Sequence, residues 1–138
     1  MEISPFKLYK PLSSFSSLSV KKGFYICGGS DGSILNSLHF FDFTKKEWIE
    51  KPSMKNKRED FGFVLGVDNK IYSIGGFNGQ KCLKECERYD PSKEAWEDIA
   101  SLNYPRRSLG CVALADGIYA IGGILNDKNC NYVEKYHH

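Results

Sequence analysis

The sequence has no long hydrophobic run and no excess of charge of one sign, and each absence excludes a class of protein. Purely apolar runs such as Phe63-Val64-Leu65 are only a few residues long, whereas a membrane-spanning helix needs about 20 apolar residues. The 19 Lys and Arg against 17 Asp and Glu leave a net charge of +2. Proteins that bind nucleic acid or a membrane surface usually carry a dense basic field instead. We therefore expect neither kind of partner.

A secretory leader and a disulfide framework are also absent from the pattern. The first 20 residues are rich in serine and contain two prolines and two lysines, where a signal peptide needs an apolar stretch of roughly seven to fifteen residues. The cysteine count of five is odd, whereas a secreted disulfide framework normally has an even count. Cys82 and Cys86 have no second Cys/His pair at zinc-site spacing. These features predict a cytoplasmic protein with reduced thiols and no metal or other cofactor.

Motifs of catalysis are missing as well. The sequence contains neither Gly-x-Ser-x-Gly nor a phosphate-binding glycine loop. Of its three histidines, His137 and His138 end the sequence and His39 stands alone, so a catalytic triad or a metal cluster is hard to build. We predict that the chain is not an enzyme.

What the sequence does have is an internal repeat. Three double glycines recur at an interval of 47 residues, each after a short apolar run with a tyrosine at the same place. An aromatic residue, a tryptophan and an arginine then follow at matching offsets in successive copies. The positions that define the repeat are Gly28, Gly29, Gly75, Gly76, Gly122 and Gly123, with Tyr72, Tyr89, Tyr119, Trp48, Trp96, Arg58 and Arg106.

Each copy is predicted to form four short strands, because alternating runs and turn pairs such as Asp116-Gly117 recur without any helical period. The chain is thus expected to be all-β. Sheets of about 47 residues would bury both faces only by stacking against one another, with tyrosine and tryptophan filling the gaps. We divide the sequence into a leader or remnant of a preceding unit (1–10), a degenerate copy (11–54), a complete copy (55–102) and a copy truncated before its fourth strand (103–138).

This pattern resembles the kelch repeat, in which a double glycine after an apolar strand is followed by Tyr-Asp, a tryptophan and an arginine. The resemblance implies blades of a β-propeller, and propellers typically have four to eight blades. Fewer than three are present here, so the propeller would be incomplete. The sequence leaves three explanations open: a piece of a longer product, a chain that self-associates through its exposed blade faces (two chains giving a six-blade ring), or an open stack that needs a partner.

The resemblance also implies where partners bind. In kelch propellers, the loops after the double glycines and the loops that enter the first strands form a rim for recognition. We expect at least one of the residues at these positions to contact a protein or peptide, with Phe77 as an exposed anchor; ordinary turn chemistry is the alternative. The predicted rim residues are Ser30, Asp31, Asp60, Phe77, Asn78, Arg107, Ser108 and Ile124.

The function implied by the resemblance is protein–protein interaction. The main hypothesis is substrate recognition for a cullin-type ubiquitin ligase, with a BTB domain in sequence outside this chain. The alternatives are an actin-cytoskeleton scaffold and a non-catalytic part of a propeller enzyme whose active site lies in missing blades.

Overall fold

The computed structural model describes residues 7–137, so the predicted leader (1–10) lies partly outside the described residues. As predicted, the fold is all-β: within 7–137 there are strands and turns and no helix. The strands are β1 (Ser16–Val20), β2 (Gly23–Cys27), β3 (Leu38–Asp42), β4 (Glu47–Lys51), β5 (Gly62–Leu65), β6 (Ile71–Ile74), β7 (Cys86–Asp90), β8 (Ala95–Ile99), β9 (Gly110–Leu114), β10 (Gly117–Ile121), β11 (Ile124–Leu125), β12 (Lys128–Asn129) and β13 (Val133–Tyr136).

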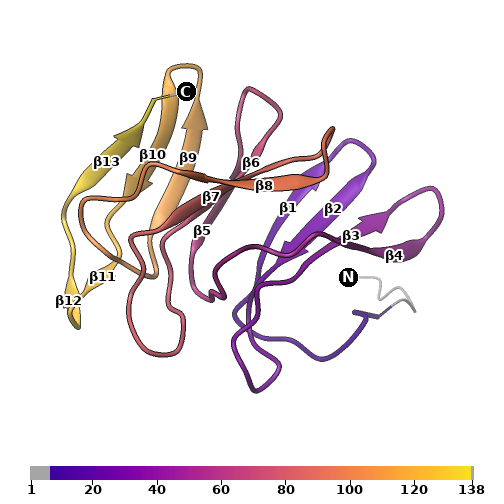
Figure 1. Cartoon of the computed structure of the whole chain (residues 1–138), viewed down its shortest axis with the longest axis horizontal. Helices are drawn as coiled ribbons and strands as arrows, with labels where there is room; N and C mark the ends of the chain where they lie inside the picture. Colours follow the sequence, from indigo (N-terminus) through magenta and orange to yellow (C-terminus); the bar gives the residue numbers. More distant parts are fainter. Residues whose placement is uncertain (1–6, 138) are drawn as a thin grey trace, which may run out of the picture.

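The strands form successive antiparallel sheets that stand side by side like the blades of a fan (Figure 1). The first blade has the order β1-β2-β3-β4 and the second β5-β6-β7-β8, while the third consists of β9, β10 and β13. The blades do not close into a ring. This arrangement confirms the prediction of an incomplete propeller.

A short hairpin is the one addition to the predicted strands. Strands β11 and β12 pair directly after the third double glycine, through Ile124 with Asn129 and Leu125 with Lys128. The two residues between them, Asn126 and Asp127, have φ angles of 49° and 60°. Two consecutive positive φ angles are what a two-residue hairpin turn requires, and Asn and Asp adopt them more readily than most residues.

The core lies between blades rather than within them. One cluster joins the first and second blades around Tyr25, Leu38 and Tyr89. The other joins the second and third blades around Tyr72, Ile74 and Ile118. Each sheet therefore buries a face only against its neighbour, as the repeat predicted.

The double glycines allow neighbouring blades to approach each other closely. Gly75 and Gly76 have φ angles of 62° and 102°, a region that residues with a Cβ rarely adopt. A Cβ on Gly75 would lie 2.7 Å from the carbonyl oxygen of Arg106 in the next blade. The amide of Gly76 instead donates to that oxygen at 2.8 Å, and Gly29 donates to the carbonyl of Arg58 at 3.0 Å.

The repeat arginines that accept these hydrogen bonds also bond to the blade that follows. Arg58 is fully buried; its Nη1 donates to the carbonyls of Gly75 and Glu85 at 2.7 and 2.9 Å, and its Nη2 lies 2.7 Å from the carboxylate of Glu87. The main chain of the same residue bonds to Gly29 and Leu35 of the preceding blade. One residue thus bonds two blades through its backbone and its side chain.

The same arrangement recurs at the next blade. Arg106 donates to the carbonyls of Gly122 and Tyr132 and pairs with Glu134. The first blade departs from it: Leu12 and His39 hold the positions of the arginine and the glutamate. His39 stacks on Tyr9 with ring centroids 3.8 Å apart, and burial lowers the pKa of its imidazole.

Each tryptophan reaches the chain segment just before its own blade. The indole Nε1 of Trp96 donates to the carbonyl of Pro52 at 2.7 Å, and that of Trp48 donates to the carbonyl of Lys7 at 2.9 Å. Trp96 also packs against the core cluster of the first two blades and lies 5.2 Å from the ring of Tyr89. These contacts place Trp96 between blades.

Trp96→Ala should lower the free energy of unfolding by about 3 kcal/mol, because it removes a large ring from between two sheets. Trp96→Phe, which keeps a ring but loses the bond to Pro52, should lose only about 1 kcal/mol. Urea unfolding followed by circular dichroism measures both. A loss below about 1 kcal/mol for the alanine variant would contradict the placement.

Arg58→Met should lower the free energy of unfolding by about 3–5 kcal/mol, because it leaves the carboxylate of Glu87 buried without its counter-charge. The double variant Arg58→Met/Glu87→Gln removes both charges and keeps an oxygen acceptor for the amide of Lys55. Urea titration should show a smaller loss for the double variant than for the single one. Equal losses would mean that Arg58 and Glu87 are not energetically coupled.

Candidate protein-interaction rim

The loops predicted to form a rim are paired with one another in the structure. The residue after each double glycine makes an antiparallel bridge with a residue of the loop that enters the first strand of a blade. The three bridges join Ser13 to Ser30, Glu59 to Phe77 and Arg107 to Ile124. Because these loops are held by backbone hydrogen bonds, the rim side chains project from a fixed main chain.

Phe77 and Arg107 form the centre of this rim. The guanidinium carbon of Arg107 lies 5.0 Å from the centroid of the Phe77 ring, a cation–π arrangement between two blades. Phe77 was expected to be exposed; it is partly buried, because the guanidinium covers one side of its ring. The backbone of Phe77 is held by two bonds with Glu59, each 2.9 Å long. The pair presents a cation and an aromatic ring together.

A line of three residues in the left-handed conformation runs from blade to blade beside this pair. Ser14, Asp60 and Ser108 have φ angles of 54°, 57° and 55°. The amide of Ser108 donates to the carbonyl of Asp60 at 2.9 Å, and its hydroxyl donates to the Asp60 carboxylate. Asp60 and Ser108 are exposed. An acceptor and a hydroxyl therefore lie at the surface of the rim in fixed positions.

Other predicted rim residues shape turns. The side chain of Asn78 accepts the amides of Gln80 and Lys81, each at 2.9 Å, and the hydroxyl of Ser30 accepts the amide of Gly32. Asp31 accepts the amide of Ser33 and pairs with Lys10 at 2.8 Å; the hydrogen bond from the Lys10 ammonium holds the pKa of Asp31 below its usual value. Asp31 remains exposed.

The structure brings the predicted residues together in two groups. Phe77, Arg107 and Ile124 are linked by the cation–π contact and by a bridge, with Asp60 and Ser108 on the adjacent loops. Ser30 and Asp31 belong to the loops of the first blade, where Ser30 is bonded to Ser13 and Asp31 to Lys10.

The sequence reasoning missed the glutamates that pair with the repeat arginines. Glu87 and Glu134 occupy equivalent positions in β7 and β13, and both approach an arginine. Their recurrence at the repeat interval was the available signal. Arg58 and Arg106 are consequently occupied within the fold, whereas Arg107 faces the rim.

Two further observations concern chemistry and membranes. Over residues 7–137, no three His, Cys, Asp or Glu side chains gather in a way that could hold a metal ion. No helix in that range is long and apolar enough to cross a membrane.

Comparison with known proteins agrees with this architecture. The family model for the kelch motif matches residues 11–55 and 64–103. A kelch repeat and BTB domain-containing protein of Caenorhabditis elegans is 37% identical over 92 residues, which cover 66% of this chain and 16% of that protein. Kelch-like protein 35 of Mus musculus is 30% identical over 115 residues, which cover 83% of this chain and 20% of that protein.

A third relative is viral. Kelch repeat and BTB domain-containing protein 1 of Ectromelia virus is 32% identical over 111 residues, which cover 77% of this chain and 20% of that protein. The chain thus spans a fifth or less of the length of these relatives. With two motif matches that together cover more than half of its residues, the chain belongs to the kelch-repeat family.

Proposed function

We propose that this chain is a protein-interaction module that binds a peptide segment of its partner at the rim. The observation that carries the proposal is the Phe77–Arg107 pair, in which residues of two blades combine an aromatic ring with a cation 5.0 Å away. Aromatic residues and arginine are enriched among the residues that contribute most to binding energy at protein interfaces.

The surroundings of this pair support peptide binding. Asp60 offers a carboxylate and Ser108 a hydroxyl within a fixed loop ladder, and Ile124 adds a partly buried apolar side chain. Loops on a rigid β-scaffold are preferred sites for recognition because the scaffold fixes their geometry at little entropic cost. The near-neutral net charge of +2 favours a protein partner over a polyanion.

We further propose that this recognition selects substrates for a cullin-type ubiquitin ligase. Two of the relatives described above carry a BTB domain by name, and the proposed adaptor would use such a domain in sequence outside this chain. Its partner-binding part would then be the kelch blades. Actin attachment is the alternative among binding functions, and sedimentation with filamentous actin checks it.

Peptide selection against the immobilised chain tests the rim directly. Peptides enriched from a random 12-residue phage library should bind about tenfold more weakly to the Phe77→Ala variant and to the Arg107→Ala variant, because each loses one half of the cation–π pair. Biolayer interferometry with the selected synthetic peptides measures the change in Kd.

The matched control is Val67→Ala. Val67 is also apolar and is 60% exposed, but it lies in the turn between β5 and β6, at the opposite end of the second blade from Phe77. Peptide binding and melting temperature should be unchanged in this control. Peptides that bind the Phe77→Ala and Arg107→Ala variants as tightly as the parent chain would remove the rim from the proposal.

A further inference from the structure

The loop between β6 and β7 contains the single Asn-Gly pair of the sequence, Asn78-Gly79. The side-chain amide of an asparagine can be attacked at Cγ by the main-chain nitrogen of the next residue, which closes a five-membered succinimide ring. Glycine as the next residue favours this reaction, because it has no side chain to hinder the approach. Gly79 and Gln80 are exposed, so water reaches the pair.

Two main-chain amides point at the oxygen that would carry the negative charge of such an attack. The amides of Gln80 and Lys81 both donate to Oδ1 of Asn78, each at 2.9 Å. Attack on Cγ converts this oxygen into an oxyanion, and donors about 2.7–3.1 Å away stabilise an oxyanion in the transition state. The amide of Asn78 donates to the carbonyl of Lys81 at 3.2 Å, which closes the loop around this oxygen. The loop therefore forms an oxyanion site.

The attacking nitrogen is not held by another contact. Within residues 7–137 the amide of Gly79 donates no hydrogen bond, whereas the amides of Asn78 and Gln80 on either side are both bonded. Gly79 has a φ angle of 98°, in a region that favours glycine. A Cβ at this position would have Cδ1 of Ile34, at 3.4 Å, as its nearest neighbour. The space beside the nitrogen is thus open.

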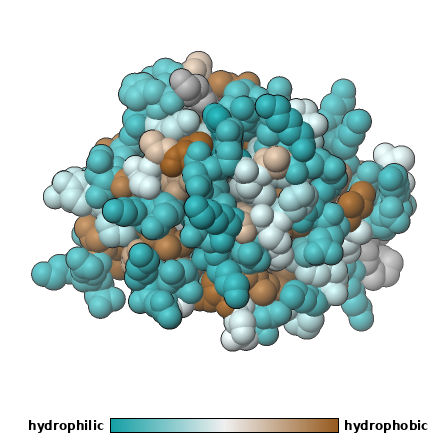
Figure 2. All heavy atoms as spheres, in the orientation of Figure 1, coloured by the Kyte–Doolittle hydropathy of each residue, from teal (hydrophilic) through white to brown (hydrophobic). Residues whose placement is uncertain are grey.

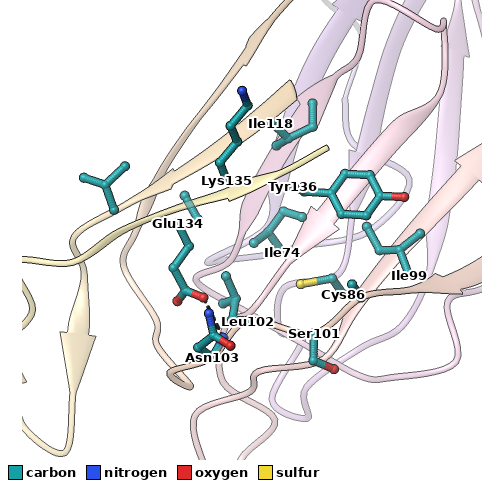
Figure 3. A pocket seen from close by; sticks show the side chains of 13 residues that line it. Ile74, Cys86, Ile99, Ser101, Leu102, Asn103, Ile118, Glu134, Lys135 and Tyr136 are labelled. Carbon is teal, nitrogen blue, oxygen red and sulfur yellow. Dashed lines mark hydrogen bonds between the residues drawn. The ribbon is translucent and has the colours of Figure 1, made fainter. Parts of the chain in front are cut away.

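Asn103 has the opposite arrangement and serves as an internal reference. It lies beside Glu134 at the cavity between the second and third blades (Figure 3). The main-chain amides of Asn103 and Tyr104 donate to the Glu134 carboxylate at 2.6 and 3.4 Å. The nitrogen that would attack Cγ of Asn103 is therefore bonded to a carboxylate, and it belongs to a residue with a large side chain. We expect Asn103 to remain an amide.

The loop can accommodate the carboxylate that the reaction would produce. Asp31 holds the position of Asn78 in the first blade, since each is the second residue after a double glycine. Oδ1 of Asp31 accepts the amide of Ser33 at 3.2 Å, as Oδ1 of Asn78 accepts the amide of Gln80. The molecular surface in view is mainly hydrophilic (Figure 2), and an added surface carboxylate remains hydrated.

We propose that Asn78-Gly79 is a modification site at which the chain converts its own asparagine into aspartate or isoaspartate. The nitrogen of Gly79 loses its proton to hydroxide and bonds to Cγ of Asn78, while the bond from Cγ to Nδ2 breaks. Nδ2 takes a proton from water and leaves as ammonia. Water then opens the succinimide: addition at Cγ gives aspartate, and addition at the main-chain carbonyl carbon gives isoaspartate.

The consequence would be a new negative charge on the rim, directly after Phe77. Isoaspartate would also lengthen the main chain by one methylene inside the loop that the Phe77–Cys82 bridge closes. The rim would then lose affinity for acidic segments of a partner as the protein ages, because like charges repel. This effect on binding rests on the proposed function, whereas the conversion itself does not.

Parallel incubation of the 138-residue chain and a capped peptide of residues 75–81 at neutral pH tests the site. Peptide mapping by mass spectrometry measures conversion of Asn78, and isoaspartate methyltransferase labelling detects isoaspartate. Asn78 should convert at least twofold faster in the chain than in the peptide, because only the folded loop holds both donor amides on Oδ1. A smaller ratio, or conversion of Asn103 as fast as that of Asn78, would overturn the proposal.

Removal of one donor amide tests the oxyanion site. Gln80→Pro lacks the amide that donates to Asn78, whereas the matched control Gln80→Ala keeps it. In the folded chain the proline variant should convert at least fivefold more slowly, and the alanine variant should convert like the parent. The same changes in the peptide should leave its rate unchanged. A proline variant with the melting temperature and the conversion rate of the parent would contradict the proposal, and the chain-to-peptide ratio tests it independently of any variant.

Asn78→Asp reproduces the aspartate product and tests its effect on the rim. Acidic peptides selected on the parent chain should bind this variant about threefold more weakly. The matched control Asn69→Asp, in the exposed turn between β5 and β6, should bind them like the parent. Unchanged affinity for Asn78→Asp would overturn the effect on binding alone. Absence of conversion, together with weaker peptide binding by Phe77→Ala, would overturn the modification site and leave the proposed function standing.

Discussion

The fold depends on one kind of buried contact, which is made twice. In each case an arginine bonds to the preceding blade through its backbone and to the following blade through its side chain. Arg58 accepts the amide of Gly29 through its carbonyl and pairs with Glu87 through its guanidinium. A fully buried charge is tolerated only when it is paired and hydrogen-bonded. The arginine therefore requires both the close approach that the double glycine permits and the carboxylate that its own blade supplies.

This requirement explains why the repeat features occur together. In the second and third blades the double glycine, the arginine and the glutamate are all present. In the first blade, Leu12 and His39 replace the arginine and the glutamate at once. A glutamate without the arginine would be buried and unpaired, so the two changes compensate each other. Tyr9 stacks on His39 at this position.

The same dependence on neighbours produces the candidate rim. The rim loops bridge within each blade, and Phe77 and Arg107 of adjacent blades meet there through their side chains. This site combines residues that no single blade holds.

Much of the architecture could be predicted from the sequence, because the 47-residue interval places the same residue types at the same point of every blade. The four-strand pattern, the all-β class and the placement of Trp96 between blades followed from it. The contact of the Arg107 guanidinium with the Phe77 ring did not follow from the repeat, because it depends on the angle between two blades. The β11–β12 hairpin was missed because the Asn126-Asp127 turn interrupts a stretch without clear alternation.

Native-state hydrogen exchange of the double-glycine amides tests the account most directly. The amides of Gly29 and Gly76 lie outside the strands and bond to Arg58 and Arg106 of the following blades. If the arginine contacts hold the blades together, these two amides should exchange only in the global opening reaction, with the same free energy as the amides of β2 and β6. Exchange of Gly29 and Gly76 at the rate of exposed loop amides, while β2 and β6 stay protected, would contradict it.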